Sequence, residues 1–174
     1  MATPEQEKIF IELIKENERL IYKICSVYRS TELPIADLFQ EVIYNLWRAF
    51  PKFRNECAVS TWIYRIALNT CISGIRKKNR RPVSASLNEL TEQFAEADSS
   101  DENIREMYRS IQRLRNLERA IVLLYLEERS YDEIADITGL TRNNVAVKLM
   151  RIKEKLRSMN SVSDQLSYAI EDKL

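Results

Sequence analysis

With 174 residues, a formal net charge of +1, two glycines and no histidine, the chain fits one or two small, mostly helical domains. The scarce glycines exclude a phosphate-binding loop or dinucleotide fingerprint, and the missing histidine removes the commonest general base and metal ligand, so we expect no enzyme, no cofactor, no metal site and no small-molecule substrate. The sequence has no apolar run long enough to span a membrane and no signal-peptide pattern, so we expect a cytoplasmic protein without direct membrane insertion.

The N-terminal half of the chain predicts three helices. Apolar residues recur at helical spacing over 4–28, where proline at the first helical position suits a helix start, and again over 35–50. A loop follows, and a third helix over 61–79 is predicted to begin at a cap formed by Ser60 or Thr61. The apolar stripes are typical of helices that share one core.

Charge is distributed unevenly along the middle of the chain. Residues 76–81 are strongly basic, whereas every charged side chain between 82 and 103 is acidic. We predict a linker at 82–103, because this segment is rich in Ser, Glu, Asp and Ala and has few large apolar residues to bury. Local charge, rather than the net charge, decides what each part of the chain binds.

The three cysteines are too few and too widely spaced for a disulfide framework or a zinc site. Cys25 and Cys71 fall on apolar helix faces, so we expect them in the core. Cys57 lies in the predicted loop, where we expect an incidental surface thiol, and a reactive thiol is the alternative.

Helix returns after the linker, and the apolar run 120–126 predicts a buried helix behind a further helix pair. Ser130 and Glu133 have the spacing of a capping box, in which each side chain satisfies a free backbone N–H of the first turn. Gly139 supplies a turn that a side chain would strain, and Thr141 can cap the next helix.

The helix after Thr141 is amphipathic. Its inner face carries apolar residues: Val145, Leu149, Ile152 and Leu156. Its outer face carries polar and basic residues: Arg142, Asn143, Asn144, Lys148, Arg151 and Lys155. This arrangement is typical of a helix-turn-helix, which places its second helix in the DNA major groove. A solvated helical hairpin has the same local pattern, so the pattern alone leaves both interpretations open.

The whole chain resembles bacterial extracytoplasmic-function (ECF) RNA polymerase sigma factors of the sigma-70 family. The segments DLFQE at 37–41 and STWIYRIALN at 60–69 resemble sigma region 2, together with the aromatic residues between them. LERAIVL at 117–123 and the helix-turn-helix resemble sigma region 4. The resemblance implies an all-α protein with two small helical domains: region 2 at 1–81, a flexible acidic linker at 82–103, region 4 at 104–161 and a polar tail at 162–174.

Asp37, Gln40 and Glu41 lie at i, i+3 and i+4, so they share one face of a helix. The resemblance implies that this face binds the clamp helices of the largest subunit of core RNA polymerase. Acidic and amide groups suit a basic partner, and a merely solvated face is the alternative.

The resemblance also implies a surface that melts and captures the promoter −10 element. Its residues come from the loop after the second helix and from the third helix: Phe53, Arg54, Asn55, Trp62, Arg65, Asn69, Arg76, Lys77 and Arg80. Aromatic and amide groups replace the stacking and pairing that a base loses on leaving the duplex, and basic groups hold phosphates. Trp62 and Tyr64 suit the core equally well, and we expect at least one of them there.

The second helix of the helix-turn-helix is the implied reader of the −35 element. Its candidate contacts are Arg142, Asn143, Asn144, Ala146, Lys148 and Arg151. Asn can pair with adenine, Arg with guanine, and a small Ala can touch a thymine methyl. The family often has Arg or Ser near positions 146 and 147, so this chain departs from the family pattern there.

The implied partners are core RNA polymerase, at its clamp helices and flap, promoter DNA and an anti-sigma factor. Two other functions stay open on the sequence: a stand-alone helix-turn-helix regulator that binds DNA as a dimer, and a helical polymerase-binding adaptor. We find no dimer seam or ligand pocket for the regulator. The adaptor would function without Arg142, Asn144 and Arg151.

Overall fold

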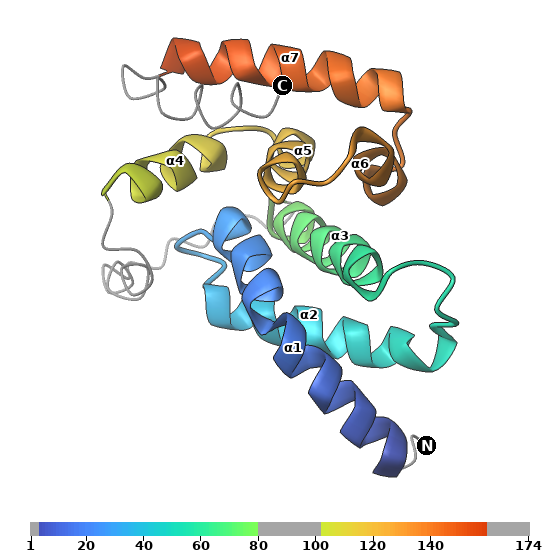
Figure 1. Ribbon diagram of the computed structural model, residues 1–174. Coiled ribbons are helices and arrows are strands. Elements are labelled where there is room, and N and C mark those ends of the chain that lie inside the picture. The colour runs from blue at the N-terminus through green and yellow to red at the C-terminus, as the bar shows by residue number, and fades with distance from the viewer. Residues whose placement is uncertain (1–3, 80–101, 160–174) are drawn as a thin grey trace. The chain divides into compact units, whose positions relative to one another are not determined.

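Figure 1 shows the computed structural model, which describes residues 4–79 and 102–159. These residues form seven α-helices and one short 3-10 helix, in two compact units. The expected all-α fold is therefore confirmed, and in the described ranges no helix is long and apolar enough to cross a membrane. Residues 82–101 of the predicted linker and the predicted tail at 162–174 lie outside the described residues.

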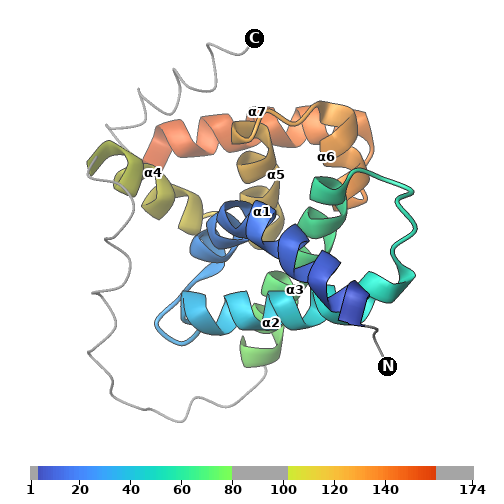
Figure 2. The same ribbon diagram turned by 60° about the horizontal axis from the view of Figure 1, so that its bottom comes forward.

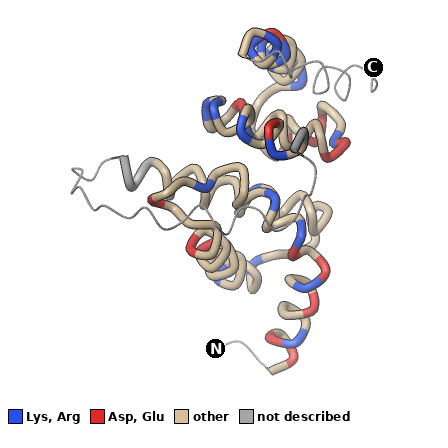
Figure 3. The backbone as a smooth tube through the Cα atoms, turned by 90° about the vertical axis from the view of Figure 1, so that its left-hand side faces the viewer, with Lys and Arg blue, Asp and Glu red and all other residues tan. Residues whose placement is uncertain are grey.

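The N-terminal unit contains three α-helices, α1 (Pro4–Tyr28), α2 (Ile35–Ala49) and α3 (Val59–Asn79), and the short helix η1 (Phe50–Lys52) directly after α2. Each α-helix packs against the other two, as Figures 1 and 2 show. Their buried side chains recur at helical spacing and include Ile21, Ile24, Val27, Leu38, Val42, Leu46, Ile63, Ala67 and Leu68. Acidic and basic positions are interspersed along α1 in Figure 3, as expected for a helix with one solvated side.

Helix α3 begins earlier than the sequence predicts. The backbone N–H of Trp62 donates to the carbonyl of Ala58 at 3.1 Å, so the helix already includes Val59. Ser60 and Thr61 therefore lie within the first turn, and the prediction that one of them caps the helix is wrong. A β-branched residue such as Val59 gives no sequence signal for a helix start, whereas the hydroxyl residues after it do.

Two cysteines lie in the core of the N-terminal unit, as predicted. Cys25 of α1 and Cys71 of α3 are both fully buried, and their side chains are hydrogen-bonded to each other. This hydrogen bond, together with burial, raises the pKa of the Cys71 thiol far above its usual value. Cys71 therefore stays protonated and packs as a small apolar residue.

The C-terminal unit contains four helices, α4 (Glu102–Gln112), α5 (Asn116–Leu126), α6 (Tyr131–Thr138) and α7 (Arg142–Met159). Helix α5 is central and contacts the other three. Its residues 120–125 are all buried, which confirms the predicted buried helix. The α6–α7 pair therefore packs against a buried helix.

Candidate nucleic-acid interface

The first helix of the α6–α7 pair begins at the predicted capping box. Ser130 Oγ accepts a hydrogen bond from the backbone N–H of Glu133 at 3.2 Å, and Glu133 Oε2 accepts from the backbone N–H of Ser130 at 2.9 Å. Arg129 lies 3.2 Å from the same carboxylate. The backbone and hydroxyl hydrogen bonds from Ser130, with the ion pair to Arg129, hold the pKa of Glu133 below its usual value.

A tight turn joins α6 to α7. Gly139 has φ 74°, in the left-handed region, and its N–H donates to the carbonyl of Ala135 at 2.9 Å. Thr141 Oγ1 then accepts from the backbone N–H of Asn144 at 3.3 Å and caps α7. The structure thus confirms the turn, both caps and the helix-turn-helix arrangement that the sequence predicts.

Helix α7 faces the unit with its predicted apolar side, since Val145, Leu149, Ile152 and Leu156 are all buried. The predicted DNA-contacting residues lie on the remaining surface of the helix. Four of them are exposed: Arg142, Asn143, Asn144 and Arg151. Two are half-buried: Ala146 and Lys148. Each therefore presents some surface to a partner.

Arg142, at the start of α7, stays available despite a nearby carboxylate. Its Nε lies 3.6 Å from Oδ2 of Asp132, with the two side chains 66% and 77% exposed. Such a solvated ion pair contributes little free energy, so a phosphate or base edge can replace Asp132.

Lys155 does not belong to the outer polar face, contrary to the sequence interpretation. Its Nζ donates to Oε2 of Glu118 on α5 at 2.8 Å, and the pair links α7 to α5. Partial burial raises the pKa of Glu118, but hydrogen bonds from Lys155 and from the N–H of Arg115 lower it by more. The pKa of Glu118 therefore lies below its usual value. The prediction fails because the partner of Lys155 lies 37 residues earlier in the chain.

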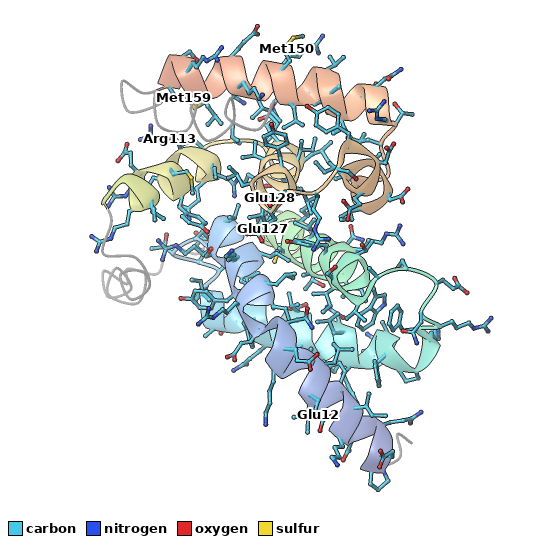
Figure 4. All side chains as sticks on the ribbon, viewed as in Figure 1. Glu12, Arg113, Glu127, Glu128, Met150 and Met159 are labelled. Carbon is cyan, nitrogen blue, oxygen red and sulfur yellow. The ribbon has the colours of Figure 1, made fainter. Side chains whose placement is uncertain are left out.

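The sequence interpretation assigned no contact to two apolar residues on the outer face of α7. Val147 and Met150 are 42% and 58% exposed, although both are large and hydrophobic. Figure 4 shows Met150 pointing away from the rest of its unit. Helical spacing predicts this exposure. Residues three or four positions apart share a helix face, and Val147 and Met150 do not have this spacing from the buried residues Val145 and Leu149.

In the N-terminal unit, the predicted polymerase-binding residues lie together on one face of α2. Asp37, Gln40 and Glu41 are all exposed, while Leu38 of the same helix is buried. One turn further along this face, Tyr44 is 59% exposed, and the Arg48 guanidinium lies 5.7 Å from its ring centroid. The exposed aromatic ring was not predicted.

An aromatic cluster supports the loop that follows η1. Phe53 stacks on Trp62, with ring centroids 4.6 Å apart and an interplanar angle of 23°. Trp62 is only 9% exposed, and its ring centroid also lies 6.4 Å from that of Phe50. The Phe50 ring in turn contacts Phe10 of α1. Tyr64 is buried as well, so the expectation of a core aromatic at one of these two positions is confirmed.

The other predicted −10 residues divide by accessibility. Arg54, Asn55 and Asn69 are exposed, Phe53 and Arg65 are half-buried, and Asn55 adopts a left-handed φ of 56°. Arg76 and Lys77 belong to the last turns of α3, but their side chains are not among those described, and Arg80 lies outside the described residues. In the described part of the chain, we find no group of three residues suited to hold a metal ion.

Comparison with known proteins identifies the two units. Residues 13–81 match the sigma-70 region 2 family, and residues 104–156 match the sigma-70 region 4 family. The ECF RNA polymerase sigma-E factor of Escherichia coli strain K12 is 28% identical over 165 residues, which span 86% of this chain and 85% of that protein. The chain belongs to the ECF group of the sigma-70 family. As an ECF sigma factor, it directs promoter-specific transcription by RNA polymerase.

Other relatives agree with this assignment. The RNA polymerase sigma-H factor of Pseudomonas aeruginosa is 25% identical to this sigma factor, over 90% of this chain and 94% of that protein. The sigma factor RpoE of Bartonella quintana, solved in complex with the anti-sigma factor NepR, matches 87% of this chain and 96% of its own with a TM-score of 0.66 and 18% identity. CnrH, in complex with the cytosolic domain of CnrY, matches 88% of both chains with a TM-score of 0.62 and 16% identity. These structures confirm the fold.

Proposed function

We propose that the outer face of α7 reads the −35 duplex in the major groove. The observation that carries this proposal is the first turn of α7, where Arg142, Asn143 and Asn144 are exposed on a helix whose opposite side is anchored. Side chains at the N-terminus of such a helix reach base edges, and Arg and Asn pair with guanine and adenine. Lys148 and Arg151, farther along, suit phosphates and flanking bases.

We further propose that the loop after η1 and the outer side of α3 capture the −10 strand. Arg54, Asn55 and Asn69 supply exposed donors and acceptors, and half-buried Phe53 supplies a ring on which a base can stack. Trp62 acts in this proposal as the support of Phe53, because the two rings are stacked and little of Trp62 is open to a ligand.

The exposed α2 face is the proposed site for the clamp helices of the polymerase. Asp37, Gln40 and Glu41 offer acceptors for a basic partner, and Tyr44 adds an aromatic contact of the kind that dominates binding energy at interfaces. We assign the flap of the polymerase as the partner of the C-terminal unit.

We assign region 2 to residues 1–81, the linker to 82–103, region 4 to 104–161 and the tail to 162–174. Polymerisation belongs to the core enzyme, so this protein needs no catalytic group, and it acts in the cytoplasm with the polymerase. An anti-sigma factor is the proposed regulator, because the structural relative RpoE is bound to one.

Transcription in vitro with purified core RNA polymerase, with and without this protein, tests the proposal on genomic fragments. We expect new starts that depend on the protein and that are lost with Arg142→Ala and with Asn69→Ala. The matched control is Arg113→Ala, which removes the same charge from an exposed site of the C-terminal unit that belongs to neither helix of the helix-turn-helix.

Three results would contradict the proposal. A footprint by the protein alone, with no new starts and no core binding, would favour a stand-alone regulator. Full activity of Arg142→Ala would refute the −35 role of α7. Equal loss with Arg113→Ala would mean that general charge, rather than base reading, carries the effect.

A further inference from the structure

Two exposed apolar side chains lie in the middle of the outer face of α7. Val147 and Met150 are three residues apart, so they are neighbours on the helix surface. The buried positions Val145 and Leu149 point the other way, into the unit. Single exposed apolar residues are normal, but this pair occupies the centre of a surface proposed to touch DNA.

The surroundings of the pair match a DNA duplex. Exposed Asn143 lies one turn before Val147 on the same face, and exposed Arg151 follows Met150. Amides and guanidinium groups suit base edges and phosphates, so the apolar centre has hydrogen-bonding and cationic neighbours toward the N-terminus and along one flank. The exposed carboxylate of Glu154, one turn after Met150, marks the C-terminal end of this surface. Ala146, one turn before Met150, presents only a methyl group and leaves that flank of Met150 uncrowded.

The major groove offers one apolar feature to such a centre. Only thymine carries a methyl group there, whereas the other bases present donors and acceptors alone. An apolar side chain set against a donor or acceptor would leave that group without its hydrogen bonds. A thymine methyl instead gains from being removed from water, and so does the side chain that covers it.

We propose that Val147 and Met150 read thymine methyl groups of the −35 element and so set the base preference of this sigma factor. The inference rests on the proposed role of α7 at the −35 duplex. The −35 element of this protein therefore contains at least one thymine, on either strand, opposite the centre of α7.

The test uses the holoenzyme, formed from core RNA polymerase and this protein, on a promoter found by the transcription assay above. Each thymine of the −35 element is replaced in turn by deoxyuridine, which removes the methyl group and nothing else. At one or two positions we expect the dissociation constant to rise about fourfold, the factor that corresponds to about 0.8 kcal/mol for one buried methyl-sized group. Replacements elsewhere in the promoter serve as controls.

Variants assign the effect to the two side chains. Val147→Thr keeps the shape but adds a hydroxyl, and Met150→Gln keeps the length but adds an amide; we expect both to lose the discrimination at their own position. Met150→Leu stays apolar and should retain it. The matched control Ile104→Ala truncates a comparably exposed apolar residue on α4 and should leave the discrimination unchanged.

The outcomes separate this inference from the function on which it rests. If scrambling the −35 sequence has no effect on initiation, both the −35 role of α7 and the inference fail. If scrambling abolishes initiation while thymine and deoxyuridine promoters bind equally, the inference alone is wrong, and another partner, such as a protein, covers the apolar pair. Discrimination that persists in Val147→Thr and Met150→Gln would likewise overturn it.

Discussion

Replacement of Gly139 by alanine tests whether the turn of the helix-turn-helix depends on backbone conformation alone. The φ of 74° is left-handed, and a Cβ placed there would meet no heavy atom within 4 Å. Steric crowding therefore adds nothing, and the cost is the left-handed conformation itself, about 1–2 kcal/mol for an L-residue. Alanine also lowers the conformational entropy of the unfolded chain, and this effect stabilises the folded protein by about 0.4–1 kcal/mol. We expect a net loss of about 1 kcal/mol for Gly139→Ala.

Urea denaturation of the full chain, followed by far-UV circular dichroism, measures this loss. For a unit of this size, a loss of about 1 kcal/mol lowers the melting temperature by about 4–8 °C. Both tryptophans, Trp47 and Trp62, belong to the N-terminal unit, so their fluorescence reports the other half of the molecule as an internal control. Gly139→Asn should lose less than Gly139→Ala, because asparagine tolerates the left-handed region. Equal stability of Gly139→Ala and the wild type, or equal losses for the two variants, would refute the reasoning.

Four further variants probe the sites. Because hydrogen bonds from Ser130 hold the pKa of Glu133 low, this carboxylate stabilises the fold above its usual pKa and stops doing so as the pH falls. The unfolding free energy of the wild type should therefore approach that of Glu133→Gln as the pH falls below the usual glutamate pKa of about 4.3, and a constant difference would contradict this. Lys155→Gln should destabilise the protein by about 0.5 kcal/mol without changing the salt dependence of promoter binding. Arg151→Gln should instead reduce by about one the steepness with which the logarithm of the promoter-binding constant falls with the logarithm of the salt concentration. Tyr44→Ala should weaken core polymerase binding about tenfold in a titration while the melting temperature stays the same, and an unchanged affinity would remove Tyr44 from the interface.

The helix-turn-helix could be predicted from the sequence because its signals are local. A capping box spans four residues, a left-handed turn needs one glycine, and the apolar spacing of α7 repeats within a few turns. Ser130, Gly139 and Thr141 therefore occupy the positions that the sequence predicts. The exposed face of α2 follows from the same helical periodicity.

The remaining features depend on contacts between distant segments. The sequence cannot show that Lys155 meets Glu118, because the pairing needs α5 and α7 to pack side by side. The sequence also cannot show which of Trp62 and Phe53 is the more accessible ring. Both residues are aromatic, and only the packing around Trp62 in the folded unit buries it. The exposed pair on α7 received no role for a different reason, because base contacts are first expected from side chains that carry hydrogen-bond donors and acceptors.

The structure also bears on how strongly this sigma factor holds DNA by itself. Two of the cations on α7 serve the unit itself: Lys155 is ion-paired, and the Lys153 ammonium lies 5.3 Å from an aromatic ring centroid, with burial lowering the pKa of Lys153. Of the other four cations of α7, Arg142, Lys148 and Arg151 belong to the proposed DNA contacts, whereas Arg157 lies in the last turn of the helix. Three contacts with phosphates give a slope of only about −3 when the logarithm of the binding constant is plotted against the logarithm of the salt concentration. Such a surface binds weakly alone, and promoter selection then requires both units to be held on one DNA by the polymerase, which makes the second contact intramolecular. We therefore expect a clear −35 footprint for the holoenzyme and a faint one for the free protein at moderate salt, and an equally strong footprint for both would show that α7 needs no help from the polymerase.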